Sequence, residues 1–248
     1  MLSKNTVKFI KSLHQKKYRS EHSKFFVEGE KSVVEVLSSD FKTDLLIATD
    51  SFLDKNHTLI SKSKIEVIQA TQKQLESLGQ YQSNDSALAV VRMKDNQGFI
   101  PSNDELILAL DDVRDPGNLG TIIRIADWYG IKNLVFSQQT ADFYNPKVIQ
   151  STMGSFTRVN FFYSDLEEVL KSWNLPVYGA FLEGENIHKL SKVEPGVILM
   201  GNESKGISQE VGELVTQKIT IPAFGSAESL NVAIATAVFC DNFKRLIS

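Results

Sequence analysis

The feature that most constrains the fold is a regular alternation of apolar runs and helical patterns from residue 105 onward. "ELILALDDV" opens this region, and "GVILMGNE" forms a second near-continuous apolar run. Such runs are typical of strands buried on both faces of a parallel sheet. Helix-like segments separate these strands and the others of the region. The pattern therefore predicts an α/β fold with a parallel sheet.

A smaller α/β pattern precedes this region. Residues 20–93 contain strand, turn and helix signals, among them "FFVEGEKSVVEVL" and a helix with Thr71 as its predicted N-cap. Residues 94–104 are polar and contain Gly98 and Pro101, which indicates a linker. Four segments are therefore expected: a basic arm or helix at 1–19, a small domain at 20–93, the linker at 94–104 and a larger domain at 105–248.

Charge is unevenly distributed along the 248 residues. The net charge is −3 overall, but residues 1–31 carry +5, whereas residues 32–100 and 101–248 carry −2 and −6. The basic start either binds a phosphate backbone or is a solvated, partly mobile helix. No apolar run approaches the ~20 residues of a membrane span, and the first residues lack a signal core. We expect a cytoplasmic protein.

The sequence offers no metal or disulfide chemistry. The four histidines are scattered without the spacing of metal ligands, so no metal is assigned. The single cysteine, Cys240, lies in an apolar helical run and is expected to be a buried packing residue.

The stretch "DDVRDPGNLGTIIRIADWYG", residues 111–130, is the first candidate site. Asn118 follows a Pro-Gly turn and is predicted to cap a helix over 118–129. Arg124 lies among isoleucine and alanine residues of that helix. An arginine in apolar surroundings needs an anion, which is either a structural carboxylate such as Glu203 or a substrate phosphate.

Two further stretches follow apolar strands. "VILMGNESKGIS" places Glu203 in a loop between two glycines. In "KITIPAFGSAESLNVAIATAVF", Ser229 is predicted to cap a helix that is buried on all sides, and Asn231 in its first turn then needs partners for its amide. Open α/β sheets bind ligands at loops that follow strands. The three loops can therefore converge on one crevice.

These stretches also carry a family resemblance. "NLGTIIR", "GNESKGIS" and "IPAFGSAESLNVAIA", in this order, resemble the three motifs of the SpoU (TrmH-like) RNA ribose 2′-O-methyltransferases of the SPOUT superfamily, over about residues 105–245. The first domain is similar to the L30e-like substrate-binding domain of many members. The resemblance implies a deep C-terminal trefoil knot, S-adenosylmethionine as cofactor, and a homodimer whose active site is completed across the interface.

The resemblance also implies residue roles. Arg124 would be the catalytic arginine. The other motif residues would be Asn118, Glu203, Ser229 and Asn231, and the cofactor would be held by backbone groups of loops that include Gly201, Ile221 and Leu230. Many members have serine where this chain has Ala233, which implies a shifted substrate or a weaker rate. Asn145 and Lys147 either contact RNA or belong to a surface loop.

Several alternatives remain at this level. The front domain favours ribosomal RNA as substrate, and transfer RNA is the alternative. A non-catalytic RNA-binding or ribosome-assembly factor on the same fold is another. A dinucleotide-binding enzyme is disfavoured, because the Gly-x-Gly-x-x-Gly fingerprint is absent. Arg124 is either the general base or a cationic clamp for a phosphate.

Overall fold

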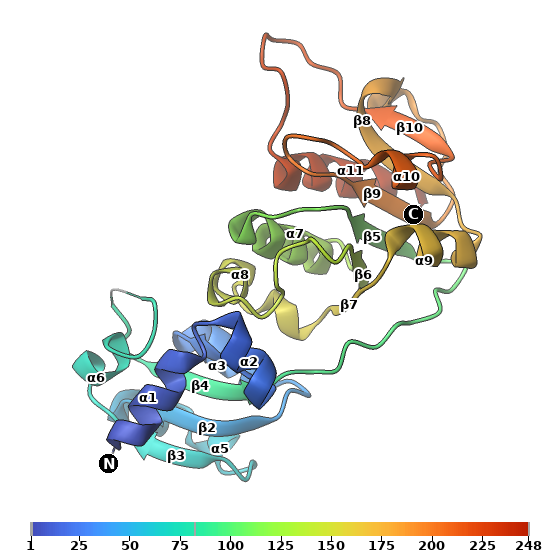
Figure 1. The fold of residues 1–248 in the computed structure, drawn as a ribbon. Helices are drawn as coiled ribbons and strands as arrows, with labels where there is room; N and C mark the ends of the chain where they lie inside the picture. Colours follow the sequence, from blue (N-terminus) through green and yellow to red (C-terminus); the bar gives the residue numbers. More distant parts are fainter. Residues whose placement is uncertain (1, 82, 248) are drawn as a thin grey trace. The chain divides into compact units, whose positions relative to one another are not determined.

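The computed structural model describes residues 2–81 and 83–247. The chain forms two compact units, one of Met1–Asp95 with Asp142–Thr157 and the other of Asn96–Ala141 with Arg158–Ser248 (Figure 1). The first chain crossing between them, at residues 95 and 96, falls inside the polar segment expected as the linker. Among the described residues, no helix is both long and apolar enough to cross a membrane.

The first unit is built on a mixed four-stranded sheet. Its strands lie in the order β1 (Lys24–Glu28), β4 (Ala87–Arg92), β2 (Thr43–Ala48) and β3 (Glu66–Gln69). β4 is antiparallel to both of its neighbours, whereas β2 and β3 are parallel. The helices of this unit are α1 (Lys4–Ser12), α2 (Lys16–His22), α3 (Glu30–Leu37), α4 (Asp50–Lys55), α5 (His57–Ile60), α6 (Gln72–Glu76) and α8 (Pro146–Thr152), with the 3-10 turn η1 (Ser155–Thr157).

The basic N-terminal segment is helical and packs onto this sheet. Ile10 of α1 and Leu13 just after it are fully buried in a core cluster with Phe26 and Leu88. Lys8 and Lys11 lie on the exposed face of the same helix. An apolar stripe opposite a charged face is what anchors a surface helix to a core. The segment is therefore part of the first unit and not a mobile arm.

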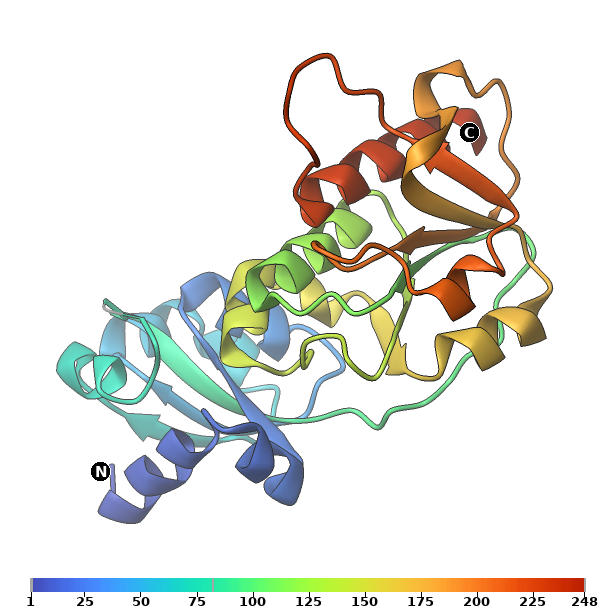
Figure 2. The ribbon, with the colours of Figure 1, turned by 45° about the horizontal axis from the view of Figure 1, so that its top comes forward.

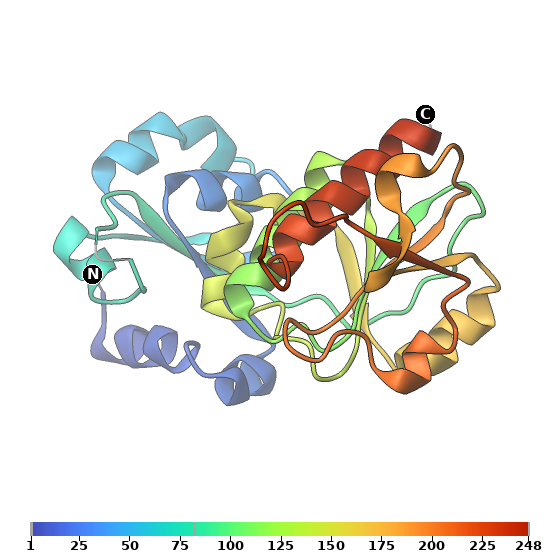
Figure 3. The same cartoon turned by 90° about the horizontal axis from the view of Figure 1, so that it is seen from above.

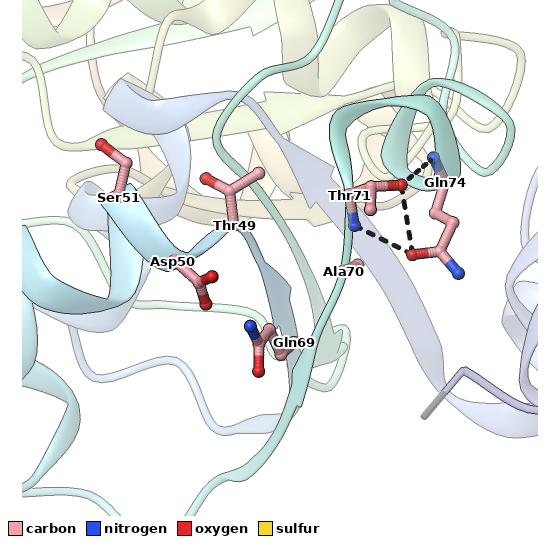
Figure 4. A pocket seen from close by; sticks show the side chains of 7 residues that line it. All are labelled: Thr49, Asp50, Ser51, Gln69, Ala70, Thr71 and Gln74. Carbon is pink, nitrogen blue, oxygen red and sulfur yellow. Dashed lines mark hydrogen bonds between the residues drawn. The ribbon is translucent and has the colours of Figure 1, made fainter.

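A shallow polar depression lies where the parallel strands β2 and β3 end. Figure 4 shows its lining, which is Thr49, Asp50, Ser51, Gln69, Ala70, Thr71 and Gln74. The Thr71 Oγ1 atom accepts from the Gln74 amide at 3.4 Å, and the Thr71 amide donates to Gln74 Oε1 at 2.9 Å. This reciprocal capping box starts α6, and it confirms Thr71 as the helix cap.

Residues 142–157 lie far along the chain but pack with the first unit. Arg19 is only 2% exposed, and its Nη2 atom forms an ion pair with Asp142 Oδ2 at 2.5 Å. The ring of Phe25 on β1 contacts the rings of Tyr144 and Phe156 at 4.6 and 5.9 Å between centroids. This segment is within the 105–248 range that the sequence assigns to the larger domain. Its aromatic residues bury themselves in the first unit instead.

The second unit contains a fully parallel six-stranded sheet. The strand order is β10 (Gln217–Thr220), β8 (Val177–Asn186), β9 (Gly196–Met200), β5 (Leu106–Leu110), β6 (Asn133–Phe136) and β7 (Asn160–Tyr163). All five strand pairs are parallel. The two most apolar runs form the central strands β5 and β9, which are buried along their whole length. The predicted α/β class with a parallel sheet is confirmed.

Helices cover both faces of this sheet, as Figure 3 shows. α9 (Leu166–Trp173) and α10 (Gln209–Gly212) pack on one face through Leu166, Leu170 and Val211. α7 (Pro116–Trp128) and α11 (Val232–Ile247) lie side by side on the other. A 3-10 turn, η2 (Ile187–Lys189), follows β8. Cys240 of α11 is fully buried, as expected, and burial raises the pKa of its thiol to about 12.

The strand order indicates where on this sheet a ligand is expected to bind. From β5 the chain runs to β6 and β7 on one side, and β9, β8 and β10 lie on the other. The direction of winding therefore reverses between β5 and β9. In open α/β sheets, ligands bind outside the carboxyl ends of strands at such a switch point. The loops after β5 and β9 begin at this point.

Candidate active site

The loop after β5 leads directly into α7, which begins earlier than the sequence predicts. Pro116 takes the first helical position, and the Asp115 carboxylate accepts from the Asn118 amide at 2.8 Å. Proline suits this position because its φ angle is already helical and the missing N–H would have no helical partner. The prediction of Asn118 as the N-cap is wrong, because Asp115 has this role. The Asn118 side chain is thereby available for other contacts.

Three side chains from the three candidate loops meet at Asn118. Asn118 Nδ2 donates to Glu203 Oε1 at 2.9 Å, and Asn231 Nδ2 donates to Asn118 Oδ1 at 2.9 Å. Asn118 thus uses both ends of its amide, one as donor and one as acceptor. Glu203 and Asn231 are exposed and Asn118 is half-buried. The structure therefore brings Asn118, Glu203 and Asn231 together as one polar cluster open to solvent.

The loop after β9 is held in shape by backbone contacts. A Cβ atom at Gly201 would lie 2.3 Å from the Gly206 carbonyl carbon, so no side chain fits at this position. Asn202 and Gly206 exchange two backbone hydrogen bonds of 2.9 Å. Gly206 has a φ angle of +71°, a conformation that glycine adopts without strain. This tight loop presents Glu203 at its exposed tip.

Asn202 is a site residue that the sequence interpretation missed. Its Nδ2 atom donates to the Asp112 carbonyl oxygen at 2.8 Å, which joins the loop after β9 to the loop after β5. Its Oδ1 atom accepts from the amides of Ser204 and Lys205 at 2.9 and 3.0 Å. Such turns are characteristic of asparagine. The Asn-Glu-Ser-Lys-Gly spacing was the signal that could have identified it.

The third loop joins β10 to α11, and two predictions about it are wrong. Asn231 caps α11, because its Oδ1 atom accepts from the amides of Ala233 and Ile234 at 2.9 and 3.3 Å. Ser229, the expected cap, lies in the exposed loop before it. Asn231 is also exposed rather than buried. The helix buries only one face in this chain, and Ile234 of its first turn is 55% exposed.

Arg124 lies on the exposed face of α7. Leu119, Ile122, Ile123 and Ala126 of the same helix are fully buried. The expected apolar surroundings are therefore on the opposite side of the helix. Within residues 2–81 and 83–247, the Arg124 guanidinium forms no ion pair, and Glu203 accepts from Asn118 instead. The arginine is free to bind an anion that comes from outside the chain.

The expected cofactor residues lie in the same strand-end loops. Gly201 follows β9 and Ile221 follows β10, and both are half-buried. Leu230 is 51% exposed in the loop before α11. Residues 223–231 are all exposed, and the loop extends away from the strands (Figure 2).

These loops fit a nucleoside. Ligand pockets combine apolar side chains with a few backbone donors and acceptors. Leu230 supplies an exposed apolar side chain, and the exposed loop over residues 223–231 supplies backbone donors and acceptors. No group of three His, Cys, Asp or Glu residues in the described part of the chain could hold a metal ion.

A parallel α/β sheet with three polar loops converging outside its carboxyl ends defines a class of small-molecule-binding α/β proteins. Residues 105–241 match the SpoU rRNA methylase family, and residues 4–89 match the MRM3-like substrate binding domain. The chain belongs to the SpoU rRNA methylase family, and the family predicted from the three motifs is confirmed.

Similar proteins extend over nearly the whole chain. The 23S rRNA (guanosine-2′-O)-methyltransferase RlmP of Bacillus subtilis is 30% identical over 94% of this chain and 93% of its own length. A TrmH-family structure from Porphyromonas gingivalis has a TM-score of 0.89 and 36% identity, covering 99% of both chains. An AdoMet-bound rRNA methyltransferase from Sinorhizobium meliloti has a TM-score of 0.88 and 29% identity, covering 99% of this chain and 96% of its own.

Proposed function

We propose that this protein transfers a methyl group from S-adenosylmethionine to a ribose 2′-hydroxyl in ribosomal RNA. The observation that carries the proposal is the polar cluster of Asn118, Glu203 and Asn231. Its hydrogen bonds link one residue from each of the three family motifs, and Asn118 lies on the helix that also carries Arg124. The relatives named 23S rRNA 2′-O-methyltransferase and AdoMet-bound rRNA methyltransferase support this substrate and this donor. Such an enzyme acts in the cytoplasm, on the RNA of the ribosome.

The loops after β9 and β10 are proposed to hold the cofactor. Backbone groups of the loops that include Gly201, Ile221 and Leu230 would contact the donor, as the family resemblance implies, and Leu230 adds an exposed apolar side chain. S-adenosylmethionine supplies a methyl group that is already activated by the positive charge on its sulfur. The protein's own task is therefore to position the hydroxyl and to stabilise its developing negative charge.

Arg124 is proposed as a cationic clamp. Its guanidinium is unpaired and exposed in the described chain, so it can take the phosphate of the target nucleotide in a two-pronged contact. A guanidinium stays charged in proteins. This charge also stabilises an alkoxide at the 2′ position. Acting as the general base instead would require a neighbouring cation that favours the uncharged form of the side chain.

The remaining motif residues are proposed to position the loops. Glu203 and Asn231 hold Asn118 from two sides and thereby fix the start of α7, the helix that carries Arg124. Ser229, in the exposed loop, is free to contact substrate or cofactor.

A knotted homodimer is the proposed form of the enzyme, following the family resemblance. Exposed apolar side chains on the two paired helices support an interface: Trp128 of α7 is 85% exposed and Ile234 of α11 is 55% exposed. Contiguous exposed apolar patches mark such interfaces, and α7 and α11 pack against each other. Analytical ultracentrifugation tests this, since Trp128→Glu should yield a monomer.

The central experiment combines cofactor binding and activity. Calorimetric titration with S-adenosylmethionine should show binding, and tritium from the labelled methyl group should enter ribosomal RNA at a ribose. Methyl transfer to tRNA alone would show that transfer RNA, and not ribosomal RNA, is the substrate. Another outcome is that the protein binds RNA but neither S-adenosylmethionine nor S-adenosylhomocysteine, even with RNA present. This result would show that it is a non-catalytic RNA-binding factor and not an enzyme.

A further inference from the structure

We propose that the groove between α1 and α2 binds an unpaired stretch of the RNA substrate, with phosphates on Lys8 and Lys11 and a base stacked on Tyr18. The inference rests on the proposed function for its RNA substrate. The inference specifies which surface of the first unit binds the RNA, and it specifies that the bound RNA is unpaired. Figure 1 shows the two helices, in the darkest blue, as successive elements at the start of the chain.

The groove has the size and the charge for a nucleotide chain. Its volume is about 650 Å³, within the range of small-ligand pockets. Lys8 and Lys11 line it from α1, three residues apart and so on one helix face. Both lysines are exposed, and within the described chain neither forms an ion pair. No aspartate or glutamate is among the lining residues. Two unpaired cations in a hollow without carboxylates attract phosphate.

Aromatic rings complete the groove. Phe9 of α1 and His22 of α2 are in edge contact, with ring centroids 5.2 Å apart and planes at 73°, and this contact links the two helices. Tyr18 lies on α2 four residues before His22, on the same helix face, and is half-exposed. Lys17 Nζ lies over the Tyr18 ring, 5.7 Å from its centroid, so a base that stacks on this partly exposed ring meets a cation beside it. The combination of rings and lysines is that of single-strand binding sites.

The pairing state of the RNA follows from the rings. In a duplex, each base face is covered by its neighbours, so a tyrosine cannot stack on it. In single-stranded loops, bulges and ends, bases can be splayed out and stacked on aromatic side chains. The groove therefore selects unpaired RNA over duplex RNA.

A second hollow of the first unit has the opposite character. The depression in Figure 4 is lined by neutral residues and the Asp50 carboxylate, without any lysine or arginine. Phosphate would be repelled there. Charge therefore assigns the RNA to the α1–α2 groove, in the segment where residues 1–31 carry +5.

Fluorescence anisotropy with the full chain tests the proposal. The probe is a labelled single strand of about 12 nucleotides of mixed sequence, a length typical of such sites, and a duplex of the same length is the comparison. Lys8→Gln with Lys11→Gln should weaken single-strand binding and lower the slope of log affinity against log salt by about 1.4. Lys62→Gln with Lys64→Gln is the matched control, because these lysines are exposed elsewhere in the unit.

The tyrosine is tested separately. Tyr18→Ala should weaken single-strand binding about tenfold, whereas Tyr18→Phe keeps the ring and should bind like the wild type. Equal thermal unfolding temperatures of all variants show that the fold is kept. The Phe variant separates the contribution of the ring from that of the hydroxyl, because the two aromatic side chains differ only in this group.

Two results would overturn the proposal that this groove binds RNA. One is wild-type affinity in both the lysine and the alanine variants, and the other is an equal loss of affinity in the Lys62 and Lys64 control. These results are independent of the proposed function, which fails if no chain binds S-adenosylmethionine or methylates ribosomal RNA. A wild-type protein that methylates RNA while its groove variants keep full RNA affinity would refute the groove alone.

Discussion

At the scale of single residues, Asn118 links the three motifs through one amide. Its nitrogen donates a hydrogen bond to Glu203 and its oxygen accepts one from Asn231, so each end of the amide has a defined partner. An amide is the side chain that can donate on one side and accept on the other. This explains why asparagine occupies the position although it does not cap the helix.

Replacing Asn118 by aspartate should therefore impair the site. The new carboxylate would face the Glu203 carboxylate where a 2.9 Å hydrogen bond exists now. We expect methyl transfer to fall about a hundredfold, because displaced loops misalign the reacting groups. The unfolding free energy should change by only about 1 kcal/mol, since the cluster is open to solvent. Single-turnover rates and urea unfolding measure the two effects. Full activity in Asn118→Asp would show that the Glu203 contact has no positioning role.

Arg124 can be assigned a role by comparing two substitutions. Arg124→Ala should lower the rate of methyl transfer by about 10²–10³, as removal of one electrostatic stabiliser does elsewhere, with the affinity for S-adenosylmethionine unchanged. Arg124→Lys should keep part of the rate, because the charge remains while the two-pronged contact is lost.

The pH dependence of the wild-type rate separates clamp from base. A clamp that stays charged predicts that Arg124 contributes no pH dependence between about pH 7 and 10. A rate that rises with pH in the wild type and loses this rise in Arg124→Lys would instead assign Arg124 as the general base.

At the scale of elements, a buried carboxylate joins a strand to a loop in the first unit. Glu28 at the end of β1 is 7% exposed, and its oxygens accept from the amides of Gln80 at 2.8 Å and Tyr81 at 3.3 Å. Burial raises the pKa of this carboxyl above its usual 4.5, although the amide hydrogen bonds lower it. The proton is therefore held more tightly in the folded chain.

This pKa shift predicts how stability varies with pH. Between pH 4.5 and the raised pKa, the folded state binds more protons at Glu28 than the unfolded state does. The stabilisation from this group is complete below pH 4.5 and is lost as the pH rises through the folded pKa. Urea unfolding across this pH range should show that the unfolding free energy of the wild type falls as the pH rises. Glu28→Gln should lack this fall. Parallel curves for the two proteins would contradict the assignment.

At the scale of the whole molecule, the chain passes between its two units three times. Residues 142–157 return to the first unit, where the buried Arg19 meets Asp142. Arg19 Nη1 also donates to the carbonyl oxygens of Leu13 and His14 at 3.0 and 2.9 Å. The ion pair thus fixes a late segment of the chain to the first two helices.

Breaking this pair should be costly. Asp142→Ala would leave the Arg19 charge buried without its partner, and the unfolding free energy should fall by about 3 kcal/mol. Asp127→Ala is the matched control, because its partner Arg158 has a side chain that is 44% exposed. That change should cost about 1 kcal/mol or less. Chemical denaturation of both variants makes the comparison, and equal losses would show that burial of Arg19 does not matter.

The sequence by itself determined the order of the elements, the parallel sheet and the three motif loops. These features depend on local patterns: buried apolar runs such as β5 and β9, and turn residues after each strand. The start of α7 was misplaced because proline and the Asp115 cap outcompete Asn118, a choice between two adjacent local signals. The exposure of Asn231 and the single buried face of α11 were also missed, because apolar composition alone does not show which helix faces are covered.

Only the tertiary structure decided which distant residues meet. Asn118 pairs with Glu203 and Asn231 across 85 and 113 residues of sequence, and residues 142–157 join the first unit. Local patterns specify neither, because such contacts depend on strand order and on how helices pack across the sheet. The same holds for Arg124, whose exposure follows from the side of α7 that packs against the rest of the second unit. Burial of the isoleucines on one face leaves the guanidinium on the other, open to an anion from solution.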